Sequence, residues 1–433
     1  MSSLAEYILH LNKNVEGYDR EKSFQSNRLN KLGIRIIFSE NEQIINSNFK
    51  NSKNTLIVFT PAIDKKNKIL NYFKSNNFKI VKRADLLADI VNSSFCIAIA
   101  GTHGKTTTTS ILSHILYNSE LKFTSFIGGV LNKYESNIMI KGSKIFIVEA
   151  DEYDKTFLKI KPNIASILNI DGDHYDIYND IDDINNSFKK FANNLKKNGI
   201  LFHNSTLNFN GISFGEDSLA EAKIINKKNY NDKLIFDIQY QNNVYKNIVL
   251  NMLGDHNAFN AMAAFIIAIS LDIESEIIIK ALKTFPGIKR RFSVELKNPK
   301  IFIDDYAHHP SEIESIYNSV KSLYPNKKKL VIFQPHLFSR TRDFLREFAG
   351  ALEKFDKIAL LDIYPAREKP INGVSSKSIF DKINNKNKVL IEKSEIPELL
   401  FEDEHELIIS MGAGDIGDLV ETIKKTIIDQ NEN

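Results

Sequence analysis

The stretch from Phe95 to Ser110, FCIAIAGTHGKTTTTS, constrains the fold of this chain more than any other. Its first six residues, Phe95–Ala100, are apolar or small, which predicts a short buried β-strand. Gly101–Gly104 interrupts this run, and from Thr107 to Tyr117 apolar residues return at helical spacing. A strand, a glycine turn, Lys-Thr and a helix in this order predict a phosphate-binding loop.

The residues of this loop have the chemistry that nucleotide phosphates require. Glycines let backbone N–H groups approach an anion, and the start of a helix adds its partial positive charge. Lys105 can reach β- and γ-phosphate oxygens, and the hydroxyl group of Thr106 suits Mg²⁺. The loop is shorter than the common GxxxxGK[ST] pattern, because Ile99 stands where that pattern has its first glycine. The alternative is an ordinary strand–helix turn with a chance Gly-Lys-Thr. The context favours an ATP site formed by Gly101, Thr102, His103, Gly104, Lys105, Thr106 and Thr107.

Length and composition bound the class of protein. A chain of 433 residues is too long for one ordinary core and, at about 150 residues per domain, predicts roughly three domains. Its 42% hydrophobic and 26% charged residues are typical of a soluble globular protein. The net charge of +3 gives no strong field for nucleic acid or an acidic membrane, so we expect neither as a partner.

Cysteine usage and hydropathy bear on the compartment. Cys96 is the only cysteine and lies in the apolar run before the loop, where it is best interpreted as a small buried hydrophobic residue. A single cysteine allows no disulfide within the chain and fits a reducing compartment. The most apolar run, Ala261–Leu271, is too short to span a membrane, and no signal-peptide pattern opens the sequence. We therefore expect a cytoplasmic protein.

Residues 1–90 have the pattern of a small α/β unit. We expect helices at Leu4–Leu11 and Ala84–Val91, and strands at Val15–Asp19, Leu32–Phe38 and Thr55–Phe59. An acid at a strand end, here Asp19, can bind a ribose in dinucleotide-type folds, and a solvent-exposed acid is an equally good interpretation. Because the sequence opens with the helix, we expect this unit to lack the first strand and glycine turn of such a fold.

Polar side chains follow two strands of the middle part of the chain. Lys144–Val148 is a predicted strand with Glu149 at its end, and Ile164–Leu168 is another, with His174 shortly beyond it. Ligands of open α/β sheets gather outside the carboxyl ends of the strands. We therefore favour Mg²⁺ binding by Glu149 over a solvated acidic loop. For His174 a metal or phosphate role and a structural role stay equally open.

The remainder of the middle part is less specific. Alternating short strands over Ile212–Leu250 predict an antiparallel edge. A helix follows at Ala258–Leu271, and the polar residues before it, including Asn257, could cap that helix or contact a base. Pro286-Gly287 marks a boundary.

Beyond this boundary the pattern predicts a third α/β unit. We expect strands at Lys300–Ile303, Leu330–Phe333, Lys357–Leu361 and Glu406–Ser410, with helices at Ser311–Leu323 and Thr341–Phe355. The last strand runs into GAGDIG, which matches GxGxxG at Gly412–Gly417. No strand with a ribose-binding acid can follow it, so we interpret it as a tight strand-to-helix turn rather than a nicotinamide site.

Several motifs, in order along the chain from Gly101 to Gly417, together resemble the Mur ligases, the ATP-dependent enzymes that build the peptide of peptidoglycan. They are GTHGKTTTTS, EADEYD, NIDGDHYDIY, GDHNAFNAMAA, GIKRRF, DDYAHHP, FQPHLFSRTRD, LDIYPARE and GAGDIG. The resemblance implies a three-domain α/β architecture. Residues 1–90 would form a truncated Rossmann-like UDP-sugar domain, 91–287 a central P-loop ATPase-type domain, and 288–433 a C-terminal Rossmann-like domain.

The motif set looks most like the family member that joins L-alanine to UDP-N-acetylmuramate, with ATP and Mg²⁺. The resemblance implies that ATP phosphorylates the muramate carboxylate and that the alanine amine attacks the acyl phosphate. By the family pattern, Lys105, His174 and Arg340 are catalytic, and Thr106, Glu149 and His174 surround the metal. Asn257 would contact adenine, and Arg291 and Asp305 would hold ATP. The matching substrate stretch contains Tyr306, His308, Arg340 and Arg342.

Two departures and two competing functions stay open. The family usually opens with a turn close to GIGGxGMS, whereas this sequence starts with Met1-Ser2-Ser3 where that motif ends. An arginine often follows the QPH triplet, where this chain has Leu337, which favours Arg340 as the contact for the amino acid. The alternatives are the ligase that attaches a recycled tripeptide to the same nucleotide sugar, and a nucleotide-binding regulator without catalysis. The motifs do not indicate an oligomeric state.

Overall fold

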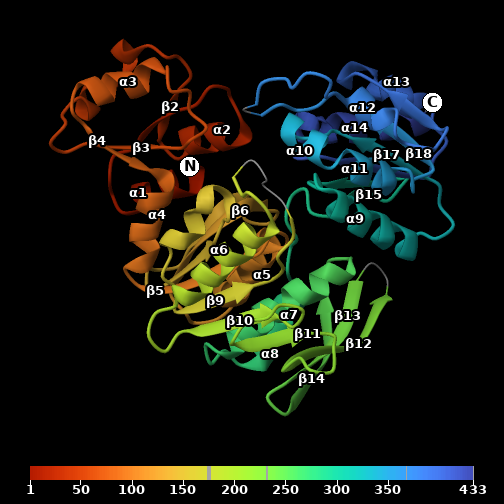
Figure 1. The fold of residues 1–433 in the computed structure, drawn as a ribbon, viewed down its shortest axis with the longest axis horizontal. Helices are drawn as coiled ribbons and strands as arrows, with labels where there is room; N and C mark the ends of the chain where they lie inside the picture. Colours follow the sequence, from red (N-terminus) through yellow and green to blue (C-terminus); the bar gives the residue numbers. More distant parts are fainter. Residues whose placement is uncertain (173–176, 231–232, 367, 433) are drawn as a thin grey trace. The chain divides into compact units, whose positions relative to one another are not determined.

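The computed structural model describes residues 1–172, 177–230, 233–366 and 368–432 (Figure 1). Its contacts divide the chain into two compact units, which we describe separately. The first comprises Met1–Lys223 and Ala263–Ala281, and the second comprises Ile224–Met262 and Leu282–Asn433. Within the described residues, no helix combines the length and apolar character needed to cross a membrane.

The N-terminal part of the first unit contains two small parallel sheets and the helices around them. One sheet pairs β1 (Glu16–Tyr18) with β2 (Arg35–Ile37), and the other pairs β3 (Leu56–Phe59) with β4 (Lys79–Lys82). The helices are α1 (Ser2–His10), α2 (Phe24–Lys31), α3 (Lys68–Ser75) and α4 (Arg83–Asn92). The predicted strand Leu32–Phe38 begins only at Arg35, because Leu32 and Gly33 close the end of α2 and Gly33 has φ +90°.

Helix α1 packs on the large central sheet. Its buried residues, Leu4 and Tyr7, belong to the hydrophobic core of that sheet. The ring of Tyr7 meets those of Phe126 and Phe146 edge-on, with centroids 5.5 and 5.9 Å apart. The first helix is therefore anchored by the sheet that carries the phosphate-binding loop.

The central sheet has ten strands in the order β14-β13-β12-β11-β10-β9-β5-β8-β6-β7. Its strands are β5 (Phe95–Ala100), β6 (Phe123–Leu131), β7 (Ser136–Ile140), β8 (Ile145–Glu149), β9 (Ile164–Ile167), β10 (Ile200–Asn204), β11 (Ile212–Gly215), β12 (Ala222–Tyr230), β13 (Lys233–Tyr240) and β14 (Asn243–Leu250). The associated helices are α5 (Lys105–Tyr117), α6 (Ile181–Asn193), α7 (Asp255–Ile269) and α8 (Ser275–Lys283).

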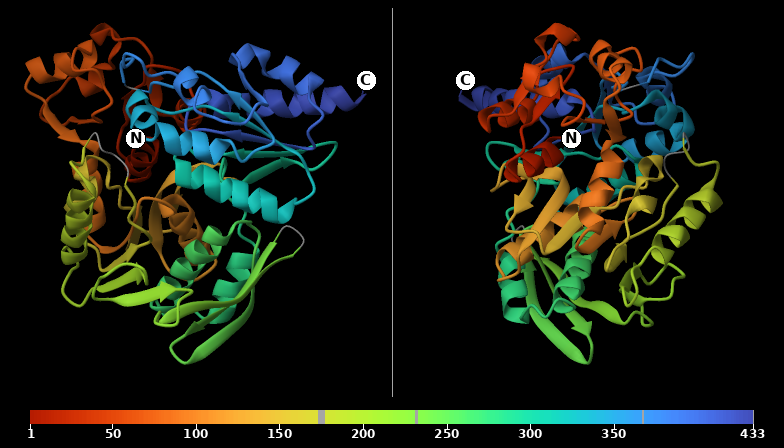
Figure 2. Two further views of the ribbon diagram at one scale, coloured as in Figure 1. Left: turned by 45° about the vertical axis from the view of Figure 1, so that its right-hand side comes forward. Right: turned by 90° about the vertical axis from the view of Figure 1, so that its left-hand side faces the viewer.

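The middle of this sheet is parallel and largely buried. Strand β5 lies between β8 and β9, parallel to both, and its residues from Cys96 to Ala100 have no exposed surface. A strand covered on both faces needs a continuous apolar run, which explains the sequence of this segment. The predicted antiparallel edge over Ile212–Leu250 is only partly right. The β13–β14 hairpin, green in Figure 2, is antiparallel, but β11 pairs in parallel with β10 and β12.

The C-terminal part of the second unit is built on a six-stranded sheet in the order β15-β16-β20-β17-β18-β19. Its strands are β15 (Ser293–Leu296), β16 (Ile301–Asp305), β17 (Lys329–Phe333), β18 (Lys357–Leu360), β19 (Lys388–Leu390) and β20 (Leu407–Met411). All neighbours are parallel except the antiparallel edge strand β15. The helices are α9 (Pro310–Leu323), α10 (Phe338–Asp343), α11 (Leu345–Leu352), α12 (Ser376–Phe380), α13 (Ile396–Glu402) and α14 (Val420–Glu432).

The single helix predicted over Thr341–Phe355 is wrong, because the chain breaks it at Phe344 into α10 and α11. Phe344 has φ −116° and ψ 28°, outside the helical region, and its ring packs edge-on against His309 at 4.7 Å. The break leaves α10 as a separate short helix that carries Arg340 and Arg342.

Candidate functional site

The predicted strand, turn and helix form as expected. Strand β5 ends at Ala100 and helix α5 starts at Lys105, with Gly101 at φ +143° and Gly104, the helix N-cap, at φ +82°. Both values lie in the region that favours glycine. A Cβ atom at Gly101 would also lie only 3.0 Å from the Cβ of Leu168. The two glycines therefore let the chain turn tightly between β5 and α5.

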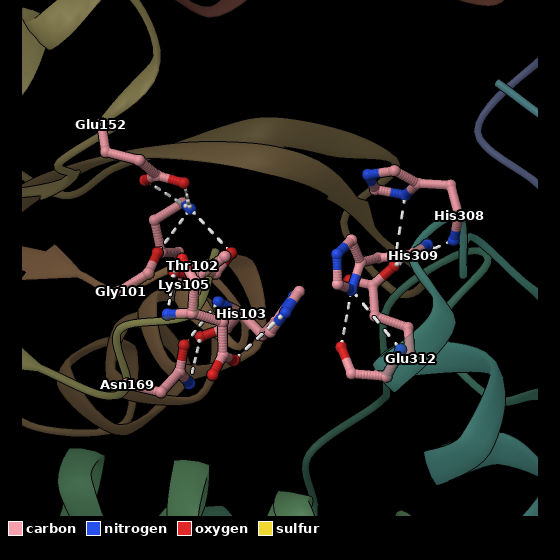
Figure 3. Close-up of polar contacts among 11 residues, drawn as sticks. Gly101, Thr102, His103, Lys105, Glu152, Asn169, His308, His309 and Glu312 are labelled. Carbon is pink, nitrogen blue, oxygen red and sulfur yellow. Dashed lines mark hydrogen bonds and ion pairs between the residues drawn. The ribbon is translucent and has the colours of Figure 1, made fainter. Parts of the chain in front are cut away.

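The segment after β9 holds this loop from one side. The backbone N–H of Thr102 donates to the carbonyl oxygen of Asn169 (3.2 Å), and that of His103 donates to the Asn169 side-chain oxygen (2.8 Å). The amide group of Asn169 donates in return to the carbonyl oxygen of His103 (3.0 Å) (Figure 3). Because these two amides bond to Asn169, the first turn of α5 is the part of the loop suited to present N–H groups to an anion.

Lys105 turns back into the loop and meets a buried acid. Its Nζ donates to the carbonyl oxygens of Gly101 (2.6 Å) and Thr102 (3.1 Å), and lies 2.9 and 2.7 Å from the two carboxylate oxygens of Glu152 (Figure 3). Burial acts to lower the pKa of Lys105, but the charges of Glu152, Asp151 and Glu149 and the Glu152 hydrogen bond outweigh it and raise the pKa. The lysine is therefore a fully charged, localised cation.

Glu152 is itself fixed. Only 3% of its surface is exposed, and its backbone carbonyl accepts a hydrogen bond from the hydroxyl group of Tyr178 (2.7 Å). It precedes the 3₁₀ segment Tyr153–Lys159, which turns the chain away after β8. The sequence marked this residue only as one of several acids in EADEYD, without a partner.

Thr106 and Glu149 lie together, as their predicted shared role requires. The hydroxyl group of Thr106 donates to Glu149 Oε2 at 3.0 Å, and the backbone N–H of Gly128 donates to Glu149 Oε1. These oxygen donors fit Mg²⁺ in kind. Across the described ranges there is no group of three or more His, Cys, Asp or Glu side chains placed to hold a metal. His174 lies outside the described residues.

Asn257 is buried near the start of α7, with 2% of its surface exposed. Its side-chain amide donates to the carbonyl oxygen of Leu253 (2.6 Å), and its side-chain oxygen accepts from Asn260 (3.2 Å). Because α7 starts at Asp255, Asn257 lies inside the helix, and these contacts are not those of an N-cap, whose side chain accepts from a backbone N–H group. A contact with adenine would have to share them.

Asp305, in the second unit, is satisfied by backbone groups. Its carboxylate accepts hydrogen bonds from the N–H groups of Phe292 (2.6 Å) and Ala307 (2.7 Å). Burial raises its pKa to about 7, although Arg291 and these hydrogen bonds act in the opposite direction. Asp305 thus ties the segment before β15 to the end of β16.

The two arginines of GIKRRF differ in their surroundings. Arg290, at φ +61°, binds Asp304 through Nε (3.0 Å) and the carbonyl oxygens of Gly412 (2.6 Å) and Gly414 (3.3 Å). The guanidinium of Arg291 lies 5.2 Å from the ring centroid of Tyr306. The guanidinium of Arg290 also lies 5.4 Å from this centroid, so both arginines lie beside Tyr306, and Arg290 in addition fastens the GAGDIG turn.

That turn is closed from within, as its interpretation as a strand-to-helix turn requires. Gln334 accepts a hydrogen bond from the N–H of Ile416 (3.0 Å) and donates to Asp415 (2.8 Å). A Cβ atom at Gly414 would lie 2.3 Å from the side-chain oxygen of Gln334, and one at Gly417 would lie 2.3 Å from Arg290.

A second group of predicted residues gathers at the ends of β16 and β17. The ring of His308 packs edge-on against Tyr306 (5.4 Å) and His336 (5.9 Å), and His336 stacks on Tyr364 (5.8 Å). His308 is held by Glu312, which accepts from its backbone N–H at 2.9 Å (Figure 3). His336 was noted within the QPH triplet, but its place in this cluster depends on the end of β17 and was not predicted.

Helix α10 brings Arg340 to this cluster and directs Arg342 elsewhere. Arg340 is buried, with 6% of its surface exposed, and its Nη1 lies 3.3 Å from His336 Nδ1. Arg342 instead pairs with Asp343 (2.7 Å) and more than half of its side chain is exposed. Glu368 secures the start of α10 by accepting from both the N–H (2.9 Å) and the hydroxyl group (2.5 Å) of Ser339. The sequence marked Glu368 only as the last residue of LDIYPARE, without a partner.

Comparisons with known proteins agree with the motifs. The Mur ligase family catalytic domain model matches residues 1–95, the Mur ligase middle domain residues 99–268, and the Mur ligase glutamate ligase domain residues 290–416. The UDP-N-acetylmuramate–L-alanine ligase of Christiangramia forsetii is 44% identical over 99% of this chain and 95% of its own length.

Solved structures have the same fold. The UDP-N-acetylmuramate–alanine ligase of Thermotoga maritima aligns with a TM-score of 0.83 and 25% identity over 100% of this chain and 97% of that one. A murein peptide ligase of Psychrobacter arcticus aligns with a TM-score of 0.70 and 19% identity over 99% and 96%. With family models across most of its length and a relative at 44% identity, this chain belongs to the Mur ligase family.

Proposed function

We propose that this chain is an ADP-forming ligase that joins L-alanine to UDP-N-acetylmuramate in peptidoglycan precursor synthesis, in the cytoplasm. The observation that carries the proposal is the 44% identity, over 99% of the chain, to a protein named as that ligase. The phosphate-binding loop with its buried lysine supports the use of ATP. Family membership alone would fit several amino-acid or peptide substrates, so the relative's name decides the choice of alanine.

The proposed reaction has two chemical steps. A carboxylate oxygen of UDP-N-acetylmuramate attacks the γ-phosphorus of ATP, which forms an acyl phosphate and releases ADP. The alanine amine then attacks the acyl carbon, and the tetrahedral intermediate loses inorganic phosphate as the amide forms. Lys105 stabilises the negative charge on the phosphoryl group in the first step. To do so, its ammonium group must exchange part of its contact with Glu152 for phosphate oxygens.

Thr106, Glu149 and His174 are the residues that would hold Mg²⁺. Bound there, the ion would neutralise charge on the β- and γ-phosphates and help to orient them. The support from the described residues is the 3.0 Å contact between the Thr106 hydroxyl group and the Glu149 carboxylate, which brings together two oxygen donors of the preferred kind.

The residues of the second unit would bind the remaining parts of the substrates. Arg340, buried beside His336, can pair bidentately with the alanine carboxylate, and Tyr306 and His308 would position the amine and the intermediate. Arg342 would act at the more exposed rim. Arg291 and Asn257 would contact ATP directly. Asp305 would help to hold ATP indirectly, by fixing the backbone at Phe292.

We further propose domain limits of 1–90 for UDP-sugar binding, 91–287 for ATP binding and 288–433 for ATP and amino-acid binding. The family models, which match residues 1–95, 99–268 and 290–416, lie close to these limits.

The substrate requirements of phosphate release test the proposed function. Phosphate release should require ATP, Mg²⁺ and UDP-N-acetylmuramate, and should respond to L-alanine but not to the tripeptide L-alanyl-γ-D-glutamyl-meso-diaminopimelate. Mass spectrometry should find the alanyl product. A response to the tripeptide alone would assign the chain to recycling. ATP binding without turnover on either substrate would indicate a regulator.

A further inference from the structure

Gly128 lies where strand β6 separates from its neighbours. Strand β6 pairs with β8 only from Phe123 to Phe126, and its register against β7 shifts between Phe126 and Leu131. An irregularity of this kind bends a strand and redirects its backbone groups. It brings Gly128 to Glu149, the last residue of β8.

The two oxygens of the Glu149 carboxylate each accept a hydrogen bond from a different element. Oε1 accepts from the backbone N–H of Gly128, which lies on β6. Oε2 accepts from the hydroxyl group of Thr106, which lies on α5, at a distance of 3.0 Å. Charged acceptors make the stronger hydrogen bonds of proteins, so these two donors fix the orientation of the carboxylate.

The missing side chain of Gly128 is as important as its N–H group. A Cβ atom there would lie 2.6 Å from Glu149 Oε2, 3.1 Å from Oε1 and 3.1 Å from Cδ, and these are its three nearest neighbours. The φ angle of Gly128 lies outside the left-handed region, so other residues could adopt this backbone. A side chain at position 128 would therefore require the Glu149 carboxylate to move from its place beside Thr106.

We propose that Gly128 is a positioning residue for Glu149: its N–H group orients the carboxylate, and its lack of a side chain leaves room for that carboxylate beside Thr106. That Glu149 is placed next to the phosphate loop in order to bind a metal ion rests on the proposed function. The contact between Gly128 and Glu149 itself does not rest on that function. The two parts can therefore be tested separately.

The test compares Gly128→Ala with Gly350→Ala, since a Cβ atom at Gly350 would meet no atom within 4 Å. We expect Gly128→Ala to weaken Mn²⁺ binding to the protein–ATP complex, measured by electron paramagnetic resonance, and to raise the Mg²⁺ concentration for half-maximal phosphate release. Outer-shell partners of metal ligands set affinity by about tenfold or more. ATP binding measured without metal should not change. Gly350→Ala should match the wild type in all three measurements.

The double variant Gly128→Ala/Glu149→Asp supplies the rescue. Aspartate is shorter by one methylene group and so withdraws the carboxylate from position 128. We therefore expect the double variant to melt at a higher temperature than Gly128→Ala, although Glu149→Asp alone should melt at a lower temperature than the wild type. If the double variant shows the sum of the decreases in melting temperature of the two single variants, the contact between Gly128 and Glu149 is overturned. Unchanged Mn²⁺ and Mg²⁺ dependence in Gly128→Ala, with a marked change in Glu149→Gln, would overturn the positioning role. No change in Glu149→Gln would instead overturn the proposed metal role, and the melting temperatures would still decide the contact.

Discussion

The ammonium group of Lys105 lies 2.7 and 2.9 Å from the two carboxylate oxygens of Glu152, so the cation proposed to meet ATP already has a buried acidic partner. A phosphate group that reaches Lys105 must compete with this carboxylate or share the cation with it. The pair keeps the lysine charged and directed into the loop, at the cost of that competition.

Glu152→Gln tests this relationship. Removing the carboxylate leaves a largely buried cation without its main counter-charge, so we expect the ATP-free protein to lose about 1–3 kcal/mol of stability. ATP phosphates would replace the lost charge. The rise in melting temperature on adding ATP should therefore be larger in Glu152→Gln than in the wild type. Equal rises would mean that ATP and Glu152 do not share Lys105.

Lys105→Ala should reduce alanine-dependent phosphate release by at least about a hundredfold, since a preorganised charge at the phosphoryl group contributes roughly 3 kcal/mol or more. The fold should persist, as judged by circular dichroism. Lys144→Ala removes an exposed lysine just before β8 and should leave the rate unchanged. A Lys105→Ala enzyme with most of its activity would contradict the phosphate-loop assignment.

His174→Ala and Glu149→Gln should each raise the Mg²⁺ requirement of the reaction, with a smaller effect on ATP binding measured without metal. Glu149 ends β8 and contacts Thr106 of the phosphate loop, and His174 follows β9 in the sequence; β8 and β9 both pair with β5, from which the loop starts. Phosphate release measured over a Mg²⁺ titration is the assay. If neither variant shifts the titration, both residues have structural roles only.

Glu368→Gln should loosen the start of α10 and so act on Arg340 at a distance. The amide can still accept one hydrogen bond from Ser339, but not two charge-assisted ones. We expect the KM for L-alanine to rise several-fold while the KM for ATP stays near the wild-type value. Glu347→Gln, on neighbouring α11, is the control. A parallel rise of both constants would indicate a general loss of folding instead.

Asp305→Asn should change how stability depends on pH. The pKa of Asp305 is raised to about 7 in the folded chain, against roughly 3.9 when unfolded. Between these values the folded state binds a proton that the unfolded state does not, so the stabilisation is complete below about pH 4 and is lost as the pH rises through 7. Between pH 5 and pH 8 the wild type should lose on the order of 2 kcal/mol more than Asp305→Asn in urea denaturation. Identical pH dependence in the two proteins would show that Asp305 is not protonated in this range.

The parts of the fold that follow from local pattern were predictable. The buried strand β5, the glycine turn and α5 are readable because apolar spacing and two glycines specify them together. The meeting of Thr106 with Glu149 follows from a general property of parallel sheets, whose strand ends share one edge.

The features that were not predicted depend on contacts between distant segments. Which acid of EADEYD meets Lys105 depends on the turn after β8 and on a hydrogen bond from Tyr178. The break before α11 depends on the packing of Phe344 against His309. A strand irregularity places Gly128, and nothing in its neighbours' polarity marks it.

The turn at Gly412–Gly417 has a consequence for how such chains are classified. The space beside Gly414 and Gly417, where a dinucleotide could approach the backbone, is filled by the side chains of Gln334 and Arg290. The N–H of Ile416 is already bonded to Gln334. A pattern search would score this segment as a cofactor fingerprint, whereas its glycines make room for side chains of the same protein. In chains that keep an arginine and a glutamine at these places, GxGxxG is a signature of internal packing, and a nicotinamide-dependent activity should not be inferred from it.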